Sequence, residues 1–248
     1  MTTDIPARAP QSGTTVRELT DIADLEEVSE LFRALWREPG GATPMSAHVL
    51  RALRLSGNYV AGAFDPSGRL VGASAGWAAP PARGELHSHV TGVVAGLQGR
   101  GIGRTLKLHQ RDWARAHGFS SITWTFDPLV RRNATFNLRV LGARAEAYLE
   151  NLYGAMEDEL NAGGESDRLL VRWELGGDAG GAAVDETASP GRRLVATPED
   201  IEVLRRSDPG EALGWRSRLR RELEPLLSSG GRILGFTQGG DYVVEEAG

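Results

Sequence analysis

The sequence predicts an α/β or α+β layer fold with a mixed sheet, and two observations carry this prediction. First, apolar residues alternate between strand and helical spacing in the order β-α-α-β-β-β-α-β-α-β-β. Second, residues 98–103 read Gln-Gly-Arg-Gly-Ile-Gly and lie between an apolar strand and an amphipathic helix. Such a loop lets consecutive backbone N–H groups converge at a helix N-terminus, where they bind phosphate.

The elements before this loop follow from apolar spacing and capping residues. Residues 14–19 are predicted as a short strand. Behind a Thr20-Asp21 cap, apolar residues recur at helical spacing up to Trp36, and Pro39-Gly40-Gly41 ends this helix. The remaining elements are a helix at 46–55, a hairpin of strands 59–64 and 70–77, and a strand at 85–94.

After the loop, a helix at 102–117 presents one apolar face and stops at Gly118, a suitable left-handed cap. Strand 121–126, helix 133–141, extended segment 145–152 and strand 169–175 complete the predicted core.

The composition changes beyond Leu175. Residues 176–191 are rich in Gly, Ala, Asp and Ser and predict a linker or long loop. Two helices are predicted to start at Thr197 and Asp208, followed by a closing hairpin of 232–236 and 242–245. We therefore expect a flexible N-terminus at 1–13, a core domain at 14–175, a linker at 176–191 and a C-terminal α/β extension at 192–248, packed on the core.

The composition excludes several classes of function. The 248 residues include no cysteine, which excludes disulfides, thiolate metal sites and a cysteine nucleophile. The five histidines show no metal-ligand spacing, so no metal is expected. A net charge of -5 argues against nucleic acid as a partner. No long apolar segment or signal peptide is visible, which predicts a cytoplasmic protein that does not bind membranes.

The spacing of the glycines limits which class of phosphate-containing ligand the loop can bind. A dinucleotide fingerprint would need glycine at Arg104 or Leu106, and a Walker loop would need a Gly-Lys-Ser/Thr tripeptide, which the chain lacks. The remaining pattern, Gln-x-x-Gly-x-Gly, resembles the coenzyme A loop of the GNAT superfamily of N-acyltransferases.

Further residues extend this resemblance over 14–175. Residues 93–98 are similar to the family pattern Val-x-Pro-x-x-Gln except for Ala95, and Leu141-Gly142-Ala143 resembles the family's Leu-Gly-Phe helix end. The stretch 124–129, with Asn133 and Asn137, resembles a less-studied branch of predicted acetyltransferases.

The resemblance implies a GNAT fold, with a mostly antiparallel central sheet flanked by helices. It also implies transfer of an acyl group, most often acetyl, from acetyl-CoA or another acyl-CoA to a primary amine of a small molecule such as an amino acid. Two alternatives stay open: an acyl-CoA sensor or scaffold without turnover, and a protein lysine or N-terminal acetyltransferase. The sequence does not decide between a monomer and a homodimer.

The resemblance also assigns the cofactor site. A bulge in the fourth strand supplies amides to pantetheine and the thioester, and by position these belong to Thr91, Gly92 and Val93. Gly92 marks either this bulge or a close packing contact. The full predicted cofactor set is Thr91, Gly92, Val93, Gln98, Gly99, Arg100, Gly101, Ile102, Gly103, Arg104 and Asn133. Gln98 is expected to brace the loop, and capping is the ordinary role for Asn133.

Acyl transfer needs a base, because an alkylammonium is almost wholly protonated near pH 7. The alternation of strand 85–94 predicts Glu85, His87 and His89 on one face, together with Thr91 and Val93. His89 and Asp127 are the two candidate bases. Their ordinary roles are a hydrogen-bonded strand histidine and a turn residue before Pro128. The predicted substrate-binding residues are Glu85, His87, Trp124 and Asn137.

One position departs from the family pattern. Many members carry a tyrosine three residues before the Leu-Gly pair, as the acid that protonates the departing thiolate, but this chain has Leu138 there. Tyr148 and Tyr153 are the nearest tyrosines in sequence.

Overall fold

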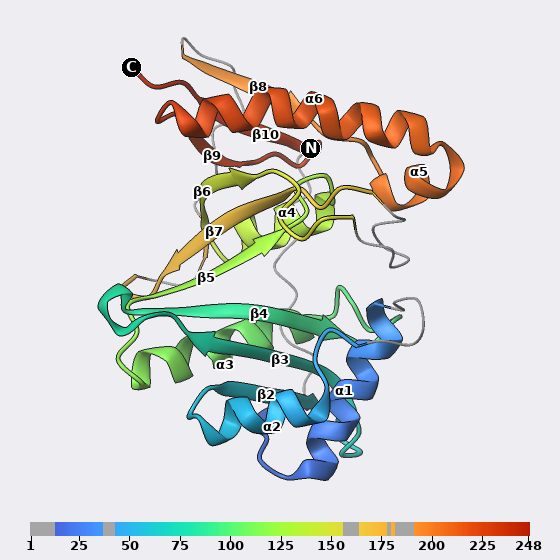
Figure 1. Cartoon of the computed structure of the whole chain (residues 1–248), viewed down its shortest axis with the longest axis vertical. Coiled ribbons are helices and arrows are strands. Elements are labelled where there is room, and N and C mark those ends of the chain that lie inside the picture. Colours follow the sequence, from blue (N-terminus) through green and yellow to red (C-terminus); the bar gives the residue numbers. More distant parts are fainter. Residues whose placement is uncertain (1–12, 37–42, 156–163, 178–179, 182–190) are drawn as a thin grey trace, which may run out of the picture. The chain divides into compact units, whose positions relative to one another are not determined.

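The computed structural model describes residues 13–36, 43–155, 164–177, 180–181 and 191–248. The chain forms two compact units, residues 1–122 and 123–248, called here the first and the second unit (Figure 1). The predicted domain boundaries at 175 and 191 stay predictions. The helix end at Pro39-Gly40-Gly41 and most of the predicted N-terminal segment and linker lie outside the described residues.

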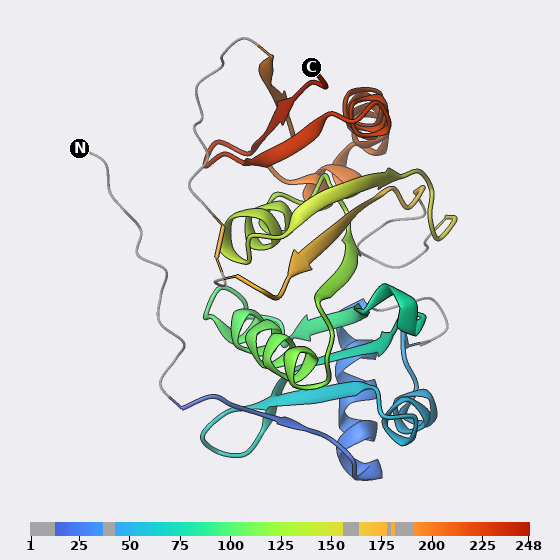
Figure 2. The same cartoon turned by 90° about the vertical axis from the view of Figure 1, so that its left-hand side faces the viewer.

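The first unit is a four-stranded antiparallel sheet between two helical layers. Neighbouring strands follow the order β1-β2-β3-β4. Helices α1 and α2 lie on one face of this sheet and α3 on the other (Figure 2). The elements are β1 (Thr15–Glu18), α1 (Ile22–Trp36), α2 (Ala47–Leu55), β2 (Tyr59–Phe64), β3 (Leu70–Ala78), β4 (Glu85–Val93) and α3 (Ile102–Ala116), with a short turn η2 (Pro81–Arg83) before β4.

A β-bulge in β4 determines which residues face each helical layer. Ala75 pairs with Val90 while the next residue, Gly76, pairs with Ser88, so His89 is the extra residue. The predicted bulge at Gly92 is wrong, because Gly92 pairs in regular register with Ala73.

The bulge also corrects the predicted faces of β4. Val90 packs in the cluster with α1 and α2, whereas Val93 packs against the cluster that contains Ile102 and Leu106 of α3. The extra residue reverses the alternation, so Thr91 and Val93 do not share a face with His89.

Gly92 is a packing glycine. A Cβ atom there would lie 2.5 Å from Leu35 Cδ1 and 3.2 Å from the ring of Trp36, both on α1. Only a residue without a side chain lets α1 approach β4 this closely. The alternative that the sequence left open at Gly92 is therefore the one observed.

The second unit contains two sheets. Strands β5, β7 and β6 lie side by side in that order, and β8, β10 and β9 form a separate antiparallel sheet. The elements are β5 (Ser121–Phe126, which crosses the boundary), α4 (Arg131–Ala134), a π-helical continuation η3 (Thr135–Val140), β6 (Arg144–Leu149), β7 (Arg168–Glu174), β8 (Arg192–Ala196), α5 (Ile201–Ser207), α6 (Pro209–Ser228), β9 (Arg232–Phe236) and β10 (Asp241–Glu245). The predicted order of core elements and the closing hairpin are confirmed.

One helix start differs from the prediction. Helix α5 begins at Ile201 rather than near Thr197, because the carboxylate of Asp200 accepts hydrogen bonds from the N–H groups of Glu202 and Val203. In contrast, α6 starts with Pro209 at its first position and Asp208 as its cap, as predicted.

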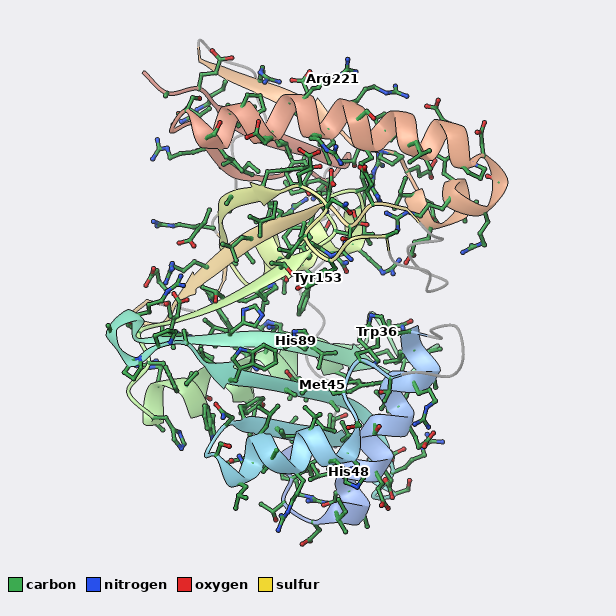
Figure 3. The ribbon with its side chains drawn as sticks, viewed as in Figure 1. Trp36, Met45, His48, His89, Tyr153 and Arg221 are labelled. Atoms are coloured by element: carbon green, nitrogen blue, oxygen red, sulfur yellow. The ribbon has the colours of Figure 1, made fainter. Side chains whose placement is uncertain are left out.

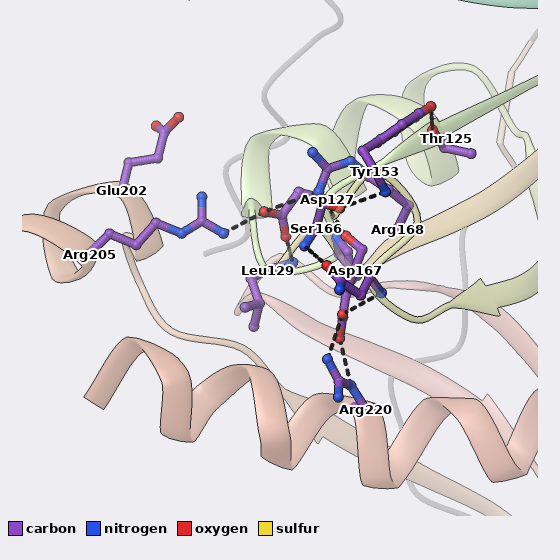
Figure 4. Close-up of polar contacts among 12 residues, drawn as sticks. Thr125, Asp127, Leu129, Tyr153, Ser166, Asp167, Arg168, Glu202, Arg205 and Arg220 are labelled. Atoms are coloured by element: carbon purple, nitrogen blue, oxygen red, sulfur yellow. Dashed lines mark hydrogen bonds and ion pairs between the residues drawn. The ribbon is translucent and has the colours of Figure 1, made fainter. Parts of the chain in front are cut away.

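Buried ion pairs hold the second unit together (Figure 4). Asp127, which directly follows β5, accepts a 2.5 Å hydrogen bond from Nη2 of Arg205 on α5. Its other oxygen accepts from the N–H of Leu129 at 3.0 Å, and Arg168 of β7 lies 4.0 Å away. All three charged side chains are more than nine-tenths buried. A further pair, Arg220 with Asp167, joins α6 to the start of β7.

Among the described residues, no helix is both long and apolar enough to span a membrane.

Replacing Gly92 by alanine tests the packing role of this glycine. The added methyl group must displace Leu35, so we expect the free energy of unfolding to fall by about 1–3 kcal/mol in chemical denaturation. Gly176→Ala is the control, because a Cβ there meets no atom of the described residues within 4 Å. Equal stability of the two variants would contradict this role.

Asp127→Asn tests the buried ion pair. Removing the charge leaves Arg205 buried without its carboxylate, and we expect a loss of about 3–5 kcal/mol in the free energy of unfolding. Glu211→Gln breaks the exposed pair with Arg218 and should cost less than about 1 kcal/mol. A loss at Asp127 no larger than at Glu211 would show that this pair does not hold the unit together.

Candidate functional site

The predicted phosphate loop has the backbone of an anion site. It connects β4 to α3, and Gly96, Gly99 and Gly101 take φ angles of 80°, 74° and 88°. Residues with side chains rarely adopt such angles, so glycine at these positions lets the backbone turn sharply three times within a few residues. The loop then meets α3, whose N-cap is Gly101.

The N–H groups of this loop are available to a ligand. Gly101 carries no side chain that could cap α3, and within the described residues no acceptor is recorded for the N–H groups of 98–104. The first N–H groups of a helix point away from it and carry the positive end of its dipole. Gln98, Gly99 and Arg100 are exposed, Gly101, Gly103 and Arg104 are half-buried, and Ile102 is buried.

Gln98 braces the loop, as its position in the motif suggests. Its Nε2 donates a 3.3 Å hydrogen bond to the carbonyl oxygen of Val93 at the end of β4. This bond closes the loop back on the strand.

The bulge lies earlier in β4 than Thr91, Gly92 and Val93, the residues whose amides the resemblance assigns to the thioester. Thr91 and Gly92 pair in register with Ser74 and Ala73, whereas His89 and Val90 lie at the bulge, where strand pairing is locally disrupted. The Thr91 hydroxyl lies 2.8 Å from Ser74 Oγ. The sequence contained no signal for a bulge at His89, because bulges of this kind need no glycine.

His87, His89 and Trp77 form an aromatic cluster on the α1 face of the sheet, where Figure 3 labels His89. The ring centroids of Trp77 lie 4.6 Å from His89 and 5.3 Å from His87. Desolvation lowers the pKa of His87 to about 4, with smaller contributions from His89 and Lys107, and desolvation also lowers the pKa of His89. Both rings are therefore neutral at pH 7, and His89, which is exposed, is able to accept a proton.

The other predicted substrate residues are buried and have polar partners. Glu85 is 4% exposed and pairs with Arg83 at 3.0 Å. In the second unit, Trp124 Nε1 donates to Asn137 Oδ1 at 3.0 Å, and both side chains are buried. These contacts favour packing roles, and the substrate roles stay predictions.

Asn133 does not cap a helix. It is the third residue of α4, whose N-cap is Val130, and it is half-buried. Its predicted contact with the cofactor stays a prediction.

Asp127 and the tyrosines lie in the second unit. The two oxygens of Asp127 bond to Arg205 and to the Leu129 N–H, which is the turn role that the sequence offered as its alternative. Leu138 is buried in η3. Tyr148 donates to Asp167, and burial together with this bond raises its pKa, so it is a poor proton donor. Tyr153 is 47% exposed, and its hydroxyl lies 3.2 Å from Thr125 Oγ1.

A buried lysine on α3 was missed by the sequence analysis. Lys107 is 3% exposed, and desolvation lowers its pKa to about 7. Its Nζ donates to Ser88 Oγ of β4 at 2.7 Å. The sequence signal that could have revealed it is the position of a lysine within the repeating apolar pattern of 102–116.

The comparisons with known proteins agree with this fold. The chain resembles the ribosomal-protein-S5-alanine acetyltransferase from Vibrio fischeri (TM-score 0.54, 18% identity, 68% of this chain and 96% of that one). It also resembles yncA, a putative acetyltransferase from Salmonella typhimurium solved with acetyl-CoA (0.53, 19%, 72% and 98%). A third structure is phosphinothricin acetyltransferase from Sinorhizobium meliloti, in complex with acetyl-CoA (0.53, 20%, 71% and 95%). These likenesses show the fold.

No curated protein matches the chain significantly. Residues 25–142, which include most of α1, the bulged β4, the glycine loop and α3, match the family described as Acetyltransferase (GNAT) family. This part of the chain therefore resembles an acetyltransferase (GNAT) domain, in agreement with the fold.

Proposed function

We propose that the protein transfers the acetyl group of acetyl-CoA to a primary amine of a small molecule. The observation that carries this proposal is the glycine loop, whose N–H groups at 98–104 have no acceptor among the described residues and lie at the N-terminus of α3. A pyrophosphate fits such a site because the amides and the helix dipole both favour its negative charge. The acetyl-CoA bound in two of the structural neighbours supports this cofactor.

The chemistry assigns work to β4. When an amine attacks a thioester, negative charge develops on the carbonyl oxygen, and fixed N–H donors lower the barrier most. The N–H groups at the His89-Val90 bulge, where strand pairing is disrupted, are proposed as these donors. The carbon–sulfur bond then breaks, and the thiolate of coenzyme A leaves.

His89 is proposed as the base that removes a proton from the acceptor ammonium. It is exposed on β4 beside the bulge, and its lowered pKa keeps the ring neutral at pH 7. Asp127 is a weaker candidate, because the bonds to Arg205 and to the Leu129 N–H engage both of its oxygens.

A second candidate function is acetylation of the N-terminal amine of a protein, which the fold similarity to the ribosomal-protein-S5-alanine acetyltransferase supports. Coenzyme A release from several acyl-CoAs should be measured with a library of small amines and with alanine-starting peptides. Faster release with small amines supports the proposed function, and release with peptides alone supports the second candidate. Tight acetyl-CoA binding without release would instead indicate a sensor.

Gly101→Trp is expected to abolish acetyl-CoA binding in titration calorimetry. An indole fills the loop, and a side chain is strained at a φ angle of 88°. Gly68→Trp is matched to it, because Gly68 has a φ angle of 81° in the β2–β3 turn, and a Cβ there meets nothing within 4 Å in the described part of the chain. This control should bind normally. Retained binding by Gly101→Trp would exclude the loop as the cofactor site.

His89→Gln is expected to lower kcat by about 100-fold or more while the Kd for acetyl-CoA is unchanged. The wild-type rate should also fall as the pH drops through the lowered pKa of His89, because a protonated base accepts no proton. This histidine-dependent limb should vanish in the variant. His117→Gln is the control, since His117 stacks on Trp113 at the far end of α3. Equal rates for wild type and His89→Gln would remove His89 as the base.

A further inference from the structure

A buried chain of polar side chains connects α3 to β3 and β4. Lys107 Nζ donates to Ser88 Oγ at 2.7 Å and to Gln110 Oε1 at 3.3 Å. Gln110 Nε2 donates to Ser74 Oγ at 3.4 Å, and Ser74 Oγ lies 2.8 Å from Thr91 Oγ1. Lys107, Gln110, Ser74 and Ser88 are each at least 96% buried. We call this set, with Thr91, the lysine network.

The lysine network holds β4 on both sides of its bulge. Ser88 is the last residue before the bulge pair His89-Val90, and Thr91 is the first after it. Both hydroxyls point to the α3 face, whereas His89 and Val90 lie on the opposite face. The path of β4 through the bulge is therefore fixed from behind by side chains of α3.

Burying Lys107 costs free energy that an apolar residue at the same position would not cost. Burying an ammonium is expensive, and the same position filled by leucine or methionine would pack without that penalty. A satisfied buried network, however, specifies one geometry, because each member fixes the position of the next. Hydrogen bonds from an ammonium are also shorter and stronger than those from a neutral amine.

We propose that Lys107 is a positioning residue that, through Ser88 and Thr91, fixes the bulge whose amides face the thioester. This inference rests on the proposed function for the role of the bulge. Loss of the lysine charge weakens the hydrogen bond to Ser88 and loosens β4 beside the reacting group. The protonation state of a side chain that touches neither cofactor nor acceptor thereby tunes the rate.

Other titratable groups lie near Lys107 or along α3, and their titration must be separated from that of Lys107. His87 of β4 interacts electrostatically with Lys107, and burial lowers its pKa to about 4. Tyr59 of β2 bonds to His109, and Glu18 of β1 accepts from Trp113, further along α3. Burial raises the pKa of Tyr59, so it does not titrate near neutrality.

The first test follows the bulge directly and needs no turnover. In a pH titration of the protein without cofactor, the amide NMR signals of His89 and Val90 are expected to shift with a midpoint at the lowered lysine pKa of about 7. Lys107→Met has a similar length and no charge, so this step should vanish while the lower histidine steps persist. A titration unchanged by Lys107→Met, or a lysine midpoint near its ordinary value, overturns the inference.

The second test measures catalysis. Lys107→Met and Ser88→Ala are both expected to lower kcat by roughly tenfold, with the Kd for acetyl-CoA unchanged, since small misplacements of reacting groups are costly. Lys107→Met should also lose the inflection near pH 7 in the rate profile. His109→Leu is the matched control, because it removes a polar contact of α3 to β2, away from the bulge.

The outcomes separate the two proposals. If His109→Leu slows the enzyme and changes its pH profile as much as Lys107→Met does, the lysine role is only structural and the inference fails. If the wild type binds no acetyl-CoA, the proposed function fails, and the amide titration still decides whether Lys107 acts on the bulge.

Discussion

The extra residue in β4 is the constraint on which the candidate site depends. A strand with strict alternation would direct His89 and Thr91 to the same face. The bulge instead places His89 and Val90 on the α1 face and returns Thr91 to the α3 face. The one inserted residue thus places the candidate base His89 on the α1 face, at a point where strand pairing is disrupted. It also places the hydroxyl of Thr91 on the α3 face, where it bonds to Ser74.

Close packing around β4 keeps this bulge in place. On the α1 face, Gly92 admits Leu35 and Trp36 so closely that the helix lies directly on the strand. On the α3 face, Lys107 and Gln110 bond to β4 and β3. The glycine loop then starts from a strand end that is held on both faces, which preorganises its amides for an anion.

Local sequence patterns predicted most of the fold. The features of the site that depend on contacts between distant residues could not be predicted from such patterns. The strands and helices of the first unit follow from apolar spacing, and the loop glycines follow from their pattern. The positive φ angles of Gly99 and Gly101 agree with that pattern. The bulge at His89 depends on pairing with β3, which no local pattern reveals. Likewise, the partner of Asp127 is Arg205, which lies 78 residues away, and no spacing in the sequence connects them.

At the end of η3, Gly142 and Arg139 contact the backbone of Gly180 and Gly181, and this contact limits which substitutions the chain tolerates. A Cβ on Gly142 would lie 2.5 Å from the carbonyl oxygen of Gly180, and one on Gly181 would lie 2.5 Å from those of Leu138 and Arg139. The N–H of Gly181 also donates to Arg139 at 3.1 Å. Two stretches about 40 residues apart thus contact each other through backbone atoms alone. A side chain added to either glycine would clash with backbone, and no smaller side chain on the opposite stretch could relieve that clash. Descendants of this protein must inherit these glycines as a set or lose the contact.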